Sequence, residues 1–100
     1  MKIDNIYKNI KNNIDDEIID EIFYSDSVKI TRISSTNQNT EWFCEDIKEV
    51  AILLEGEAVI EFEKKEISMK KGDVIIINPL ERHRVINTSP TGLWLAIYFR

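Results

Sequence analysis

Residues 49–87 have the sequence EVAILLEGEAVIEFEKKEISMKKGDVIIINPLERHRVIN, in which short apolar runs are separated by polar turns. Residues 49–54 are rich in β-branched and large apolar side chains, and residues 58–62 alternate apolar and polar side chains. Gly56 lies between these two segments and can adopt the backbone conformations that a tight turn requires. The pattern therefore predicts a β-hairpin at this place.

Short apolar segments of the same kind flank this region and fill most of the chain. Gly72 stands in a sharp turn, and Pro79 ends the run at residues 74–77 because proline lacks the N–H that a sheet needs. Many short, closely spaced strands predict a sandwich or barrel, and the lack of long helices between them argues against an α/β fold. We therefore predict an all-β fold, with further strands at residues 28–33, 41–44, 67–70, 74–77, 83–86 and 93–99.

The first quarter of the chain has a different pattern. Ile14, Ile18 and Ile22 recur four residues apart, a spacing that places them on one face of a helix. The acidic residues at positions 15–17 would favour the positive end of the helix dipole. These features predict a short helix from about Asp15 to Ile22 that packs on the barrel. The predicted organisation is an N-terminal segment, residues 1–27, followed by a barrel domain, residues 28–100.

The composition describes a single small acidic domain. The chain has 100 residues and a net charge of −5, and its lysines and arginines form no basic stripe, so we expect no nucleic-acid binding. No segment approaches the ~20 apolar residues that span a bilayer, and the first residues lack the apolar core of a signal peptide. Cys44 is the single cysteine, which excludes an intrachain disulfide. We therefore expect a cytoplasmic protein without membrane contact.

Two groups of residues within 49–87 stand at characteristic spacings: Glu49 and Gly56, with six residues between them, and then Gly72, His83 and Asn87. This arrangement resembles the two motifs of the cupin superfamily, although Asn78 and Leu80 stand where the second motif has proline and glycine. The resemblance implies a cupin-type antiparallel β-barrel, or jelly roll, with a pocket at one mouth. The matching residues are Glu49 and Gly56 in the first motif and Gly72, His83 and Asn87 in the second.

In many cupins this pocket holds a divalent metal on three histidines and one glutamate. The resemblance carries over only Glu49 and His83 as ligand positions, because His83 is the only histidine in the chain. The histidine pair of the first motif would lie four or five residues before Glu49, where residues 42–45 are Trp, Phe, Cys and Glu. Cys44 could supply a third ligand, and strand alternation would place it on the same face as Trp42. The expected cofactor is at most one weakly held divalent transition metal: Zn, Fe, Ni or Mn.

Each candidate residue also has a purely structural interpretation. His83 is either a ligand or general base, or a hydrogen-bonded remnant of a metal-binding ancestor. Glu49 either points into the pocket beside His83 or lies at the exposed start of its strand. Cys44 is either a ligand or a small buried hydrophobe. Trp42 either lines a ligand pocket or belongs to the core or to a dimer contact.

Two functions fit these residues best, and the sequence leaves open whether the protein is an enzyme. The first is a non-catalytic module that binds a small molecule, or a weakly held divalent metal, in the barrel mouth through Trp42, Cys44, Glu49 and His83. It would act as a homodimer with edge strands paired between subunits. The second is a metal-dependent oxygenase or isomerase that uses Glu49, His83 and Cys44. A purely structural role is the third possibility.

Overall fold

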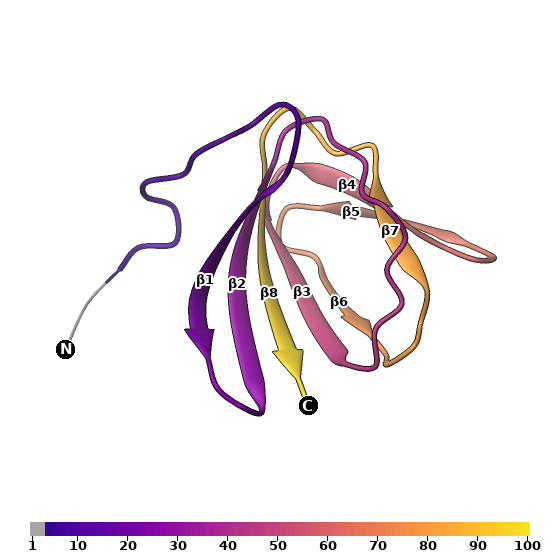
Figure 1. Ribbon diagram of the computed structural model, residues 1–100. Helices are drawn as coiled ribbons and strands as arrows, with labels where there is room; N and C mark the ends of the chain where they lie inside the picture. Colours follow the sequence, from indigo (N-terminus) through magenta and orange to yellow (C-terminus); the bar gives the residue numbers. More distant parts are fainter. Residues whose placement is uncertain (1–3) are drawn as a thin grey trace.

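The computed structural model describes residues 4–100, so the first three residues of the predicted N-terminal segment lie outside it. Within this range the chain forms β-strands and no helix (Figure 1), and nothing in it is an apolar helix of membrane-spanning length. The strands are β1 (Ile18–Tyr24), β2 (Val28–Ser35), β3 (Lys48–Glu55), β4 (Glu57–Phe62), β5 (Glu66–Lys70), β6 (Val74–Ile77), β7 (His83–Ile86) and β8 (Gly92–Phe99).

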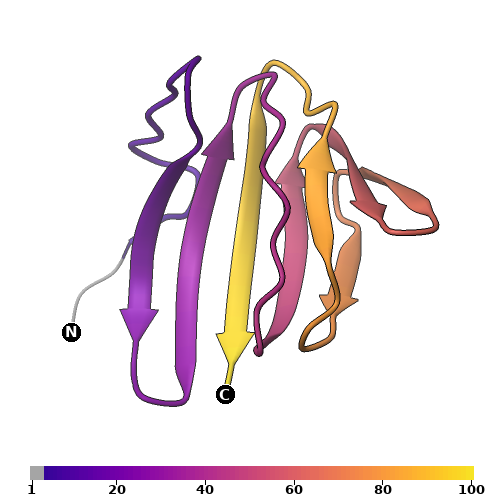
Figure 2. The same ribbon diagram turned by 45° about the vertical axis from the view of Figure 1, so that its right-hand side comes forward.

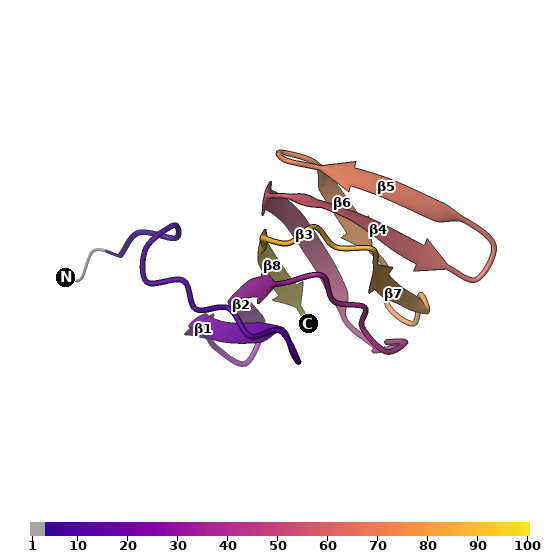
Figure 3. The same cartoon turned by 90° about the horizontal axis from the view of Figure 1, so that it is seen from above.

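The strands form two antiparallel sheets. One has five strands in the order β1-β2-β8-β3-β6, and the other has three in the order β5-β4-β7. Strands β1, β2 and β8 run side by side in Figure 2, and the view from above in Figure 3 separates them from β4, β5 and β7. The prediction of an all-β, antiparallel barrel or jelly roll is confirmed.

The hydrophobic core lies between the two sheets, because alternate side chains of each strand point inward. In β3, Ala51 and Leu53 are buried, whereas Val50 and Ile52 beside them are only half-buried. Strand β4 repeats this alternation. The buried apolar cluster comprises Ala51, Leu53, Ala58, Ile60, Phe62, Met69, Ile77 and Trp94.

The predicted helix at Asp15 to Ile22 is wrong, because most of this segment belongs to strand β1. Strand β1 pairs antiparallel with β2, with Ile19 opposite Ile33. A spacing of four residues fits a helix, but it is also a multiple of the two-residue repeat of a strand, so the three isoleucines did not distinguish the two structures. The edge of β2 supplies hydrogen-bond partners, and the Ile, Phe and Tyr side chains of β1 favour a strand.

The predicted hairpin between residues 49–54 and 58–62 is also wrong, although both segments are strands. Strand β3 pairs with β6 and β8, whereas β4 pairs with β5 and β7, so the chain passes from one sheet to the other at Gly56. Gly56 has a φ of +90°. A Cβ atom there would lie closer than 3.0 Å to Ser89 Oγ and to the carbonyl oxygen of Thr91. Glycine is therefore required at a crowded corner between the sheets.

Arg32 of β2 holds the edge of the five-stranded sheet together. Its Nη2 lies 2.7 Å from Asp20 Oδ2 on β1, and its Nη1 donates to the carbonyl oxygen of Lys8 over 2.7 Å. One guanidinium therefore links both β1 and the preceding segment to β2.

Candidate functional site

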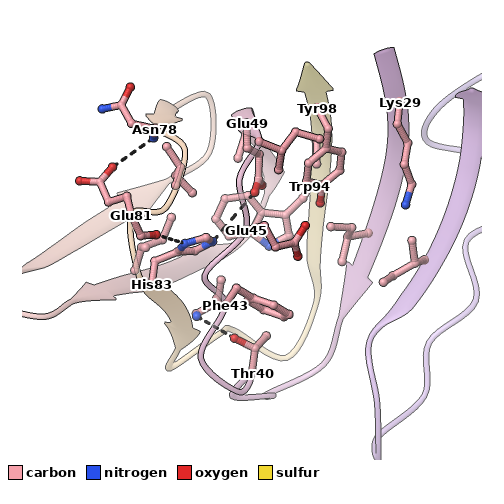
Figure 4. Close-up of a pocket in the computed structure, with 18 of the residues that line it drawn as sticks. Lys29, Thr40, Phe43, Glu45, Glu49, Asn78, Glu81, His83, Trp94 and Tyr98 are labelled. Atoms are coloured by element: carbon pink, nitrogen blue, oxygen red, sulfur yellow. Dashed lines mark hydrogen bonds and ion pairs between the residues drawn. The ribbon is translucent and has the colours of Figure 1, made fainter. Parts of the chain in front are cut away.

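A cavity of about 280 Å³ lies between the two sheets. Its walls combine many apolar side chains with a smaller group of ionisable ones (Figure 4), a combination typical of small-molecule sites. The apolar lining residues are Ile19, Ile33, Phe43, Ile47, Ala51, Ile60, Ile77, Val85, Trp94 and Ala96. The ionisable ones are Glu17, Lys29, Glu45, Glu49, Glu81, His83, Tyr98 and Arg100.

The segment that leads into β3 supplies one wall of the cavity through alternate side chains. This two-residue repeat is the one that extended chain produces, and it continues without interruption into β3. The residues between the lining positions do not face the cavity. The lining residues of this wall are Phe43, Glu45, Ile47, Glu49 and Ala51.

Trp42 and Cys44, the predicted partners of Glu49 and His83, lie outside this cavity. The Trp42 ring contacts two arginines, whose guanidinium carbons lie 4.1 Å (Arg82) and 4.6 Å (Arg84) from the ring centre. Cys44 is exposed, with its Sγ 3.6 Å from the carbonyl oxygen of Leu80. The structure therefore keeps the cysteine away from the two motif residues.

His83 of β7 is buried in the cavity wall, with 9% of its surface exposed. Its backbone pairs with Phe43, whose N–H donates to the His83 carbonyl oxygen over 2.7 Å. The ring Nδ1 lies 2.9 Å from the carbonyl oxygen of Glu81. Because a carbonyl oxygen only accepts, Nδ1 carries the hydrogen, and Nε2 of the neutral ring is an acceptor. This free acceptor is the nitrogen that faces Glu49.

Glu49 and His83 both line the cavity and their side chains lie close together, as the motif register predicted. Its Oε1 lies 3.9 Å from His83 Nε2 (Figure 4), beyond hydrogen-bond distance. Burial raises the pKa of the Glu49 carboxyl to about 7, and the nearby carboxylates of Glu45 and Glu17 contribute to the rise. The carboxyl is therefore close to half protonated at neutral pH and can either donate or accept a hydrogen bond.

Negative groups outnumber positive ones around the cavity. Burial raises the pKa of the Glu17 carboxyl and of the Tyr98 phenol, and the charge of Glu49 adds to the rise at Tyr98. The fixed cations in the lining are Lys29 and Arg100. Lys29 Nζ lies 5.7 Å from the Tyr98 ring centre, which is a cation–π contact.

The residues present do not fit the metal that the family motif implies. Glu49 and His83 form only a pair, whereas a catalytic zinc usually has three protein ligands. Within residues 4–100 there is no group of three or more His, Cys, Asp or Glu side chains arranged to hold a metal ion. A site made of one carboxyl and one imidazole supports hydrogen bonding and proton transfer instead.

Several lining residues were not identified from the sequence. Glu45 could have been found by counting back from Glu49 in steps of two, because an extended segment keeps the parity of the strand that follows it. Glu17, just before β1, and Trp94, in β8, reach the same cavity from parts of the chain distant from Glu49. No local pattern signals these long-range meetings, because they depend on the order of strands in the sheet.

Comparison with known proteins gives a consistent result. The sequence model of the family described as "Cupin domain" matches residues 39–98. A candidate mannose-6-phosphate isomerase from Ralstonia eutropha JMP134 is 27% identical, with a TM-score of 0.92 over 99% of this chain and 98% of that chain. No curated protein matches this sequence.

Two further solved structures show the same fold at lower identity. A cupin superfamily protein from Desulfitobacterium hafniense DCB-2 is 21% identical, with a TM-score of 0.82 over 90% of this chain and 83% of that chain. The TT1209 protein from Thermus thermophilus is 19% identical, with a TM-score of 0.86 over 99% and 97% of the two chains. These likenesses extend over nearly all of the strands described above.

Proposed function

This chain belongs to the cupin family, and on that basis we propose that it binds a small organic molecule in the cavity between its sheets, without a metal ion. The observation that carries the proposal is the convergence of Glu49 and His83 on one cavity with largely apolar walls. The volume of about 280 Å³ lies just below the ~300–1,000 Å³ of drug-sized ligand sites, so the molecule is a small one.

The polar pair gives the bound molecule its orientation. His83 presents Nε2 as an acceptor, and its ring is held in place by the Glu81 carbonyl oxygen on Nδ1 and by the Phe43 and Phe62 rings, 5.8 and 6.3 Å away between ring centres. A hydroxyl or amine of the ligand can donate to Nε2 and contact Glu49 at the same time. The apolar body of the ligand would pack on Trp94 and the neighbouring apolar wall. This proposed function is binding alone, without a catalytic step.

The test is ligand binding by the wild-type protein and by the His83→Ala variant. A thermal-shift screen with mannose, mannose 6-phosphate, 2-phenylethylamine and zinc chloride should give a shift with an organic compound, and none with zinc. His83→Ala should weaken the binding of that compound by about tenfold or more, because the hydroxyl or amine of the ligand loses Nε2 of His83 as its hydrogen-bond acceptor. Cys44 lies outside the cavity, so the Cys44→Ser variant should bind the compound as the wild type does. A shift with zinc alone would overturn the metal-free proposal.

We also propose that the protein forms a homodimer, as the sequence led us to expect. The β6 edge of the five-stranded sheet supports this, because its outer face exposes apolar side chains to solvent. On edge strand β6, Val74 and Ile76 are both 58% exposed, and they pair across to Ile52 and Val50 of β3. A twofold-related copy could cover this face with the same residues.

Sedimentation velocity of the wild type and of the Val74→Lys, Ile76→Lys double variant checks the homodimer. The wild type should sediment as a dimer of about 23 kDa, twice the 11.7 kDa chain mass, and the variant as a monomer, because two lysines would be buried without partners in the interface. The double substitution Lys70→Glu, Lys71→Glu near the same edge is the control and should leave the dimer intact. A monomeric wild type at millimolar concentration would contradict the proposal.

A further inference from the structure

We propose that the molecule bound in this cavity carries an ammonium group, seated among the carboxyl groups of Glu17, Glu45 and Glu49. The inference rests on the proposed function and names the chemical class of its ligand. It differs from what the printed name of the Ralstonia eutropha relative suggests, because a sugar phosphate is an anion.

The three carboxyl groups reach the cavity from two directions. Glu17 comes from the segment before β1, Glu45 from the segment that leads into β3, and Glu49 from β3 itself. Figure 4 shows Glu45 and Glu49 beside the same wall as Trp94 and Tyr98. Glu49 is half-buried, with 16% of its side chain exposed, so water screens its charge less than it screens a charge at the surface. The lining therefore concentrates negative charge at one place.

Within residues 4–100, no lysine or arginine forms an ion pair with Glu17, Glu45 or Glu49. Lys29, one of the two fixed cations in the lining, lies over the Tyr98 ring. The other, Arg100, is the last residue of the chain, and its backbone N–H donates to the Ser27 carbonyl oxygen. A cationic ligand would supply the missing positive charge.

Glu81, the remaining charged residue of the lining, is hydrogen-bonded within the protein. Glu81 Oε1 accepts a hydrogen bond from the backbone N–H of Asn78 over 3.2 Å. The backbone carbonyl oxygen of Glu81 accepts a hydrogen bond from His83 Nδ1, so this residue orients the His83 ring. Apart from the cations Lys29 and Arg100, the lining groups that can meet a ligand charge are the carboxyl groups and Nε2 of His83.

The aromatic residues add two further features that suit an organic ammonium ion. The side chains of Phe43, Trp94 and Tyr98 line the cavity, and aromatic rings attract cations while packing on apolar groups. A small organic ammonium ion with an apolar body therefore suits this aromatic lining.

Three probes of similar size and different charge test the inference: 2-phenylethylamine, 2-phenylethanol and phenylacetate. Binding to the wild-type protein is measured by isothermal titration at pH 8, where the amine is an ammonium and Glu49 is largely ionised. The amine should bind at least tenfold more tightly than the alcohol, and phenylacetate should show no binding. If the alcohol or phenylacetate binds as tightly as the amine, the ammonium inference is overturned while the proposed function stands. If none of the three binds at millimolar concentration, the ammonium inference is overturned, whereas the proposed function is decided by the screen with mannose and mannose 6-phosphate.

Matched variants locate the preference in the cavity. Glu45→Gln should weaken amine binding by about fivefold or more and leave the binding of 2-phenylethanol nearly unchanged. Glu63→Gln removes the same charge from an exposed position outside the cavity and should leave both affinities unchanged. Equal losses of amine affinity in the two variants would show that only the net charge of −5 matters, and would overturn the site. Thermal unfolding of each variant checks that it is folded.

Discussion

Replacing Glu49 by glutamine should stabilise the folded protein by about 3 kcal/mol at pH 8.5, and by only about 1 kcal/mol at pH 5.5. The reason is the cost of a buried negative charge. Burial and two neighbouring carboxylates raise the pKa of Glu49 from 4.5 to about 7 in the folded protein. Each unit of difference between the folded and unfolded pKa corresponds to about 1.4 kcal/mol of unfolding free energy.

The direction of the pH dependence follows from proton binding. Between pH 4.5 and about 7 the unfolded chain has released the Glu49 proton while the folded protein still holds it. The folded state therefore binds more protons in this range, and its stability falls as the pH rises through the range. Above pH 7 both states are ionised at this position, and the loss is complete. Glutamine has no proton to lose, so the variant lacks this contribution.

Urea unfolding of the wild type and of Glu49→Gln, followed by circular dichroism at pH 5.5, 7 and 8.5, measures this effect. The difference in unfolding free energy should grow with pH and then level off. Glu63→Gln is the control, because Glu63 is exposed, and its effect should stay within about 0.5 kcal/mol at every pH. A Glu49→Gln variant that is less stable than the wild type at pH 8.5 would show that the carboxylate is paired in solution.

Gly56→Ala should destabilise the protein by about 3 kcal/mol, whereas Gly72→Ala should cost about 1 kcal/mol. Both glycines have left-handed φ values, +90° and +91°, so an added methyl group strains the backbone at either position. At Gly56 the new Cβ would also collide with the Thr91 carbonyl oxygen and with Ser89 Oγ, whereas at Gly72 it would meet nothing within 4 Å. The difference between the two variants therefore isolates the crowding at the corner.

Thermal unfolding of the two glycine variants measures that difference. For a domain of this size, Gly56→Ala should lower the Tm by about 12 °C or more and Gly72→Ala by about 4–8 °C. Ser89→Ala combined with Gly56→Ala should recover only a small part of the loss, because the Thr91 carbonyl oxygen belongs to the backbone and cannot move aside. Equal effects of the two single variants would mean that the β7–β8 connection relaxes freely around residue 56.

The candidate site was predictable as far as short-range spacing reaches. The motif spacing placed Glu49 and His83 together, and their side-chain atoms lie 3.9 Å apart in the structure. It did not place Cys44, because the family spacing allows two registers for the residues before Glu49. The backbone pairing of Phe43 with His83 decides between them and leaves Cys44 on the outside. That pairing joins residues far apart in the chain, so no local pattern encodes it.

The sequence by itself determined that the chain is built from short antiparallel strands, because alternation of apolar side chains with a period of two is a local property. Only the tertiary structure decided which strands are neighbours. It made a strand of residues 18–24 by offering the edge of β2, turned Gly56 into a corner between sheets, and brought Glu17 and Trp94 to the cavity beside Glu49. The physical reason is that hydrogen bonds and packing between strands distant in the chain outweigh local preferences, which are small for any single residue.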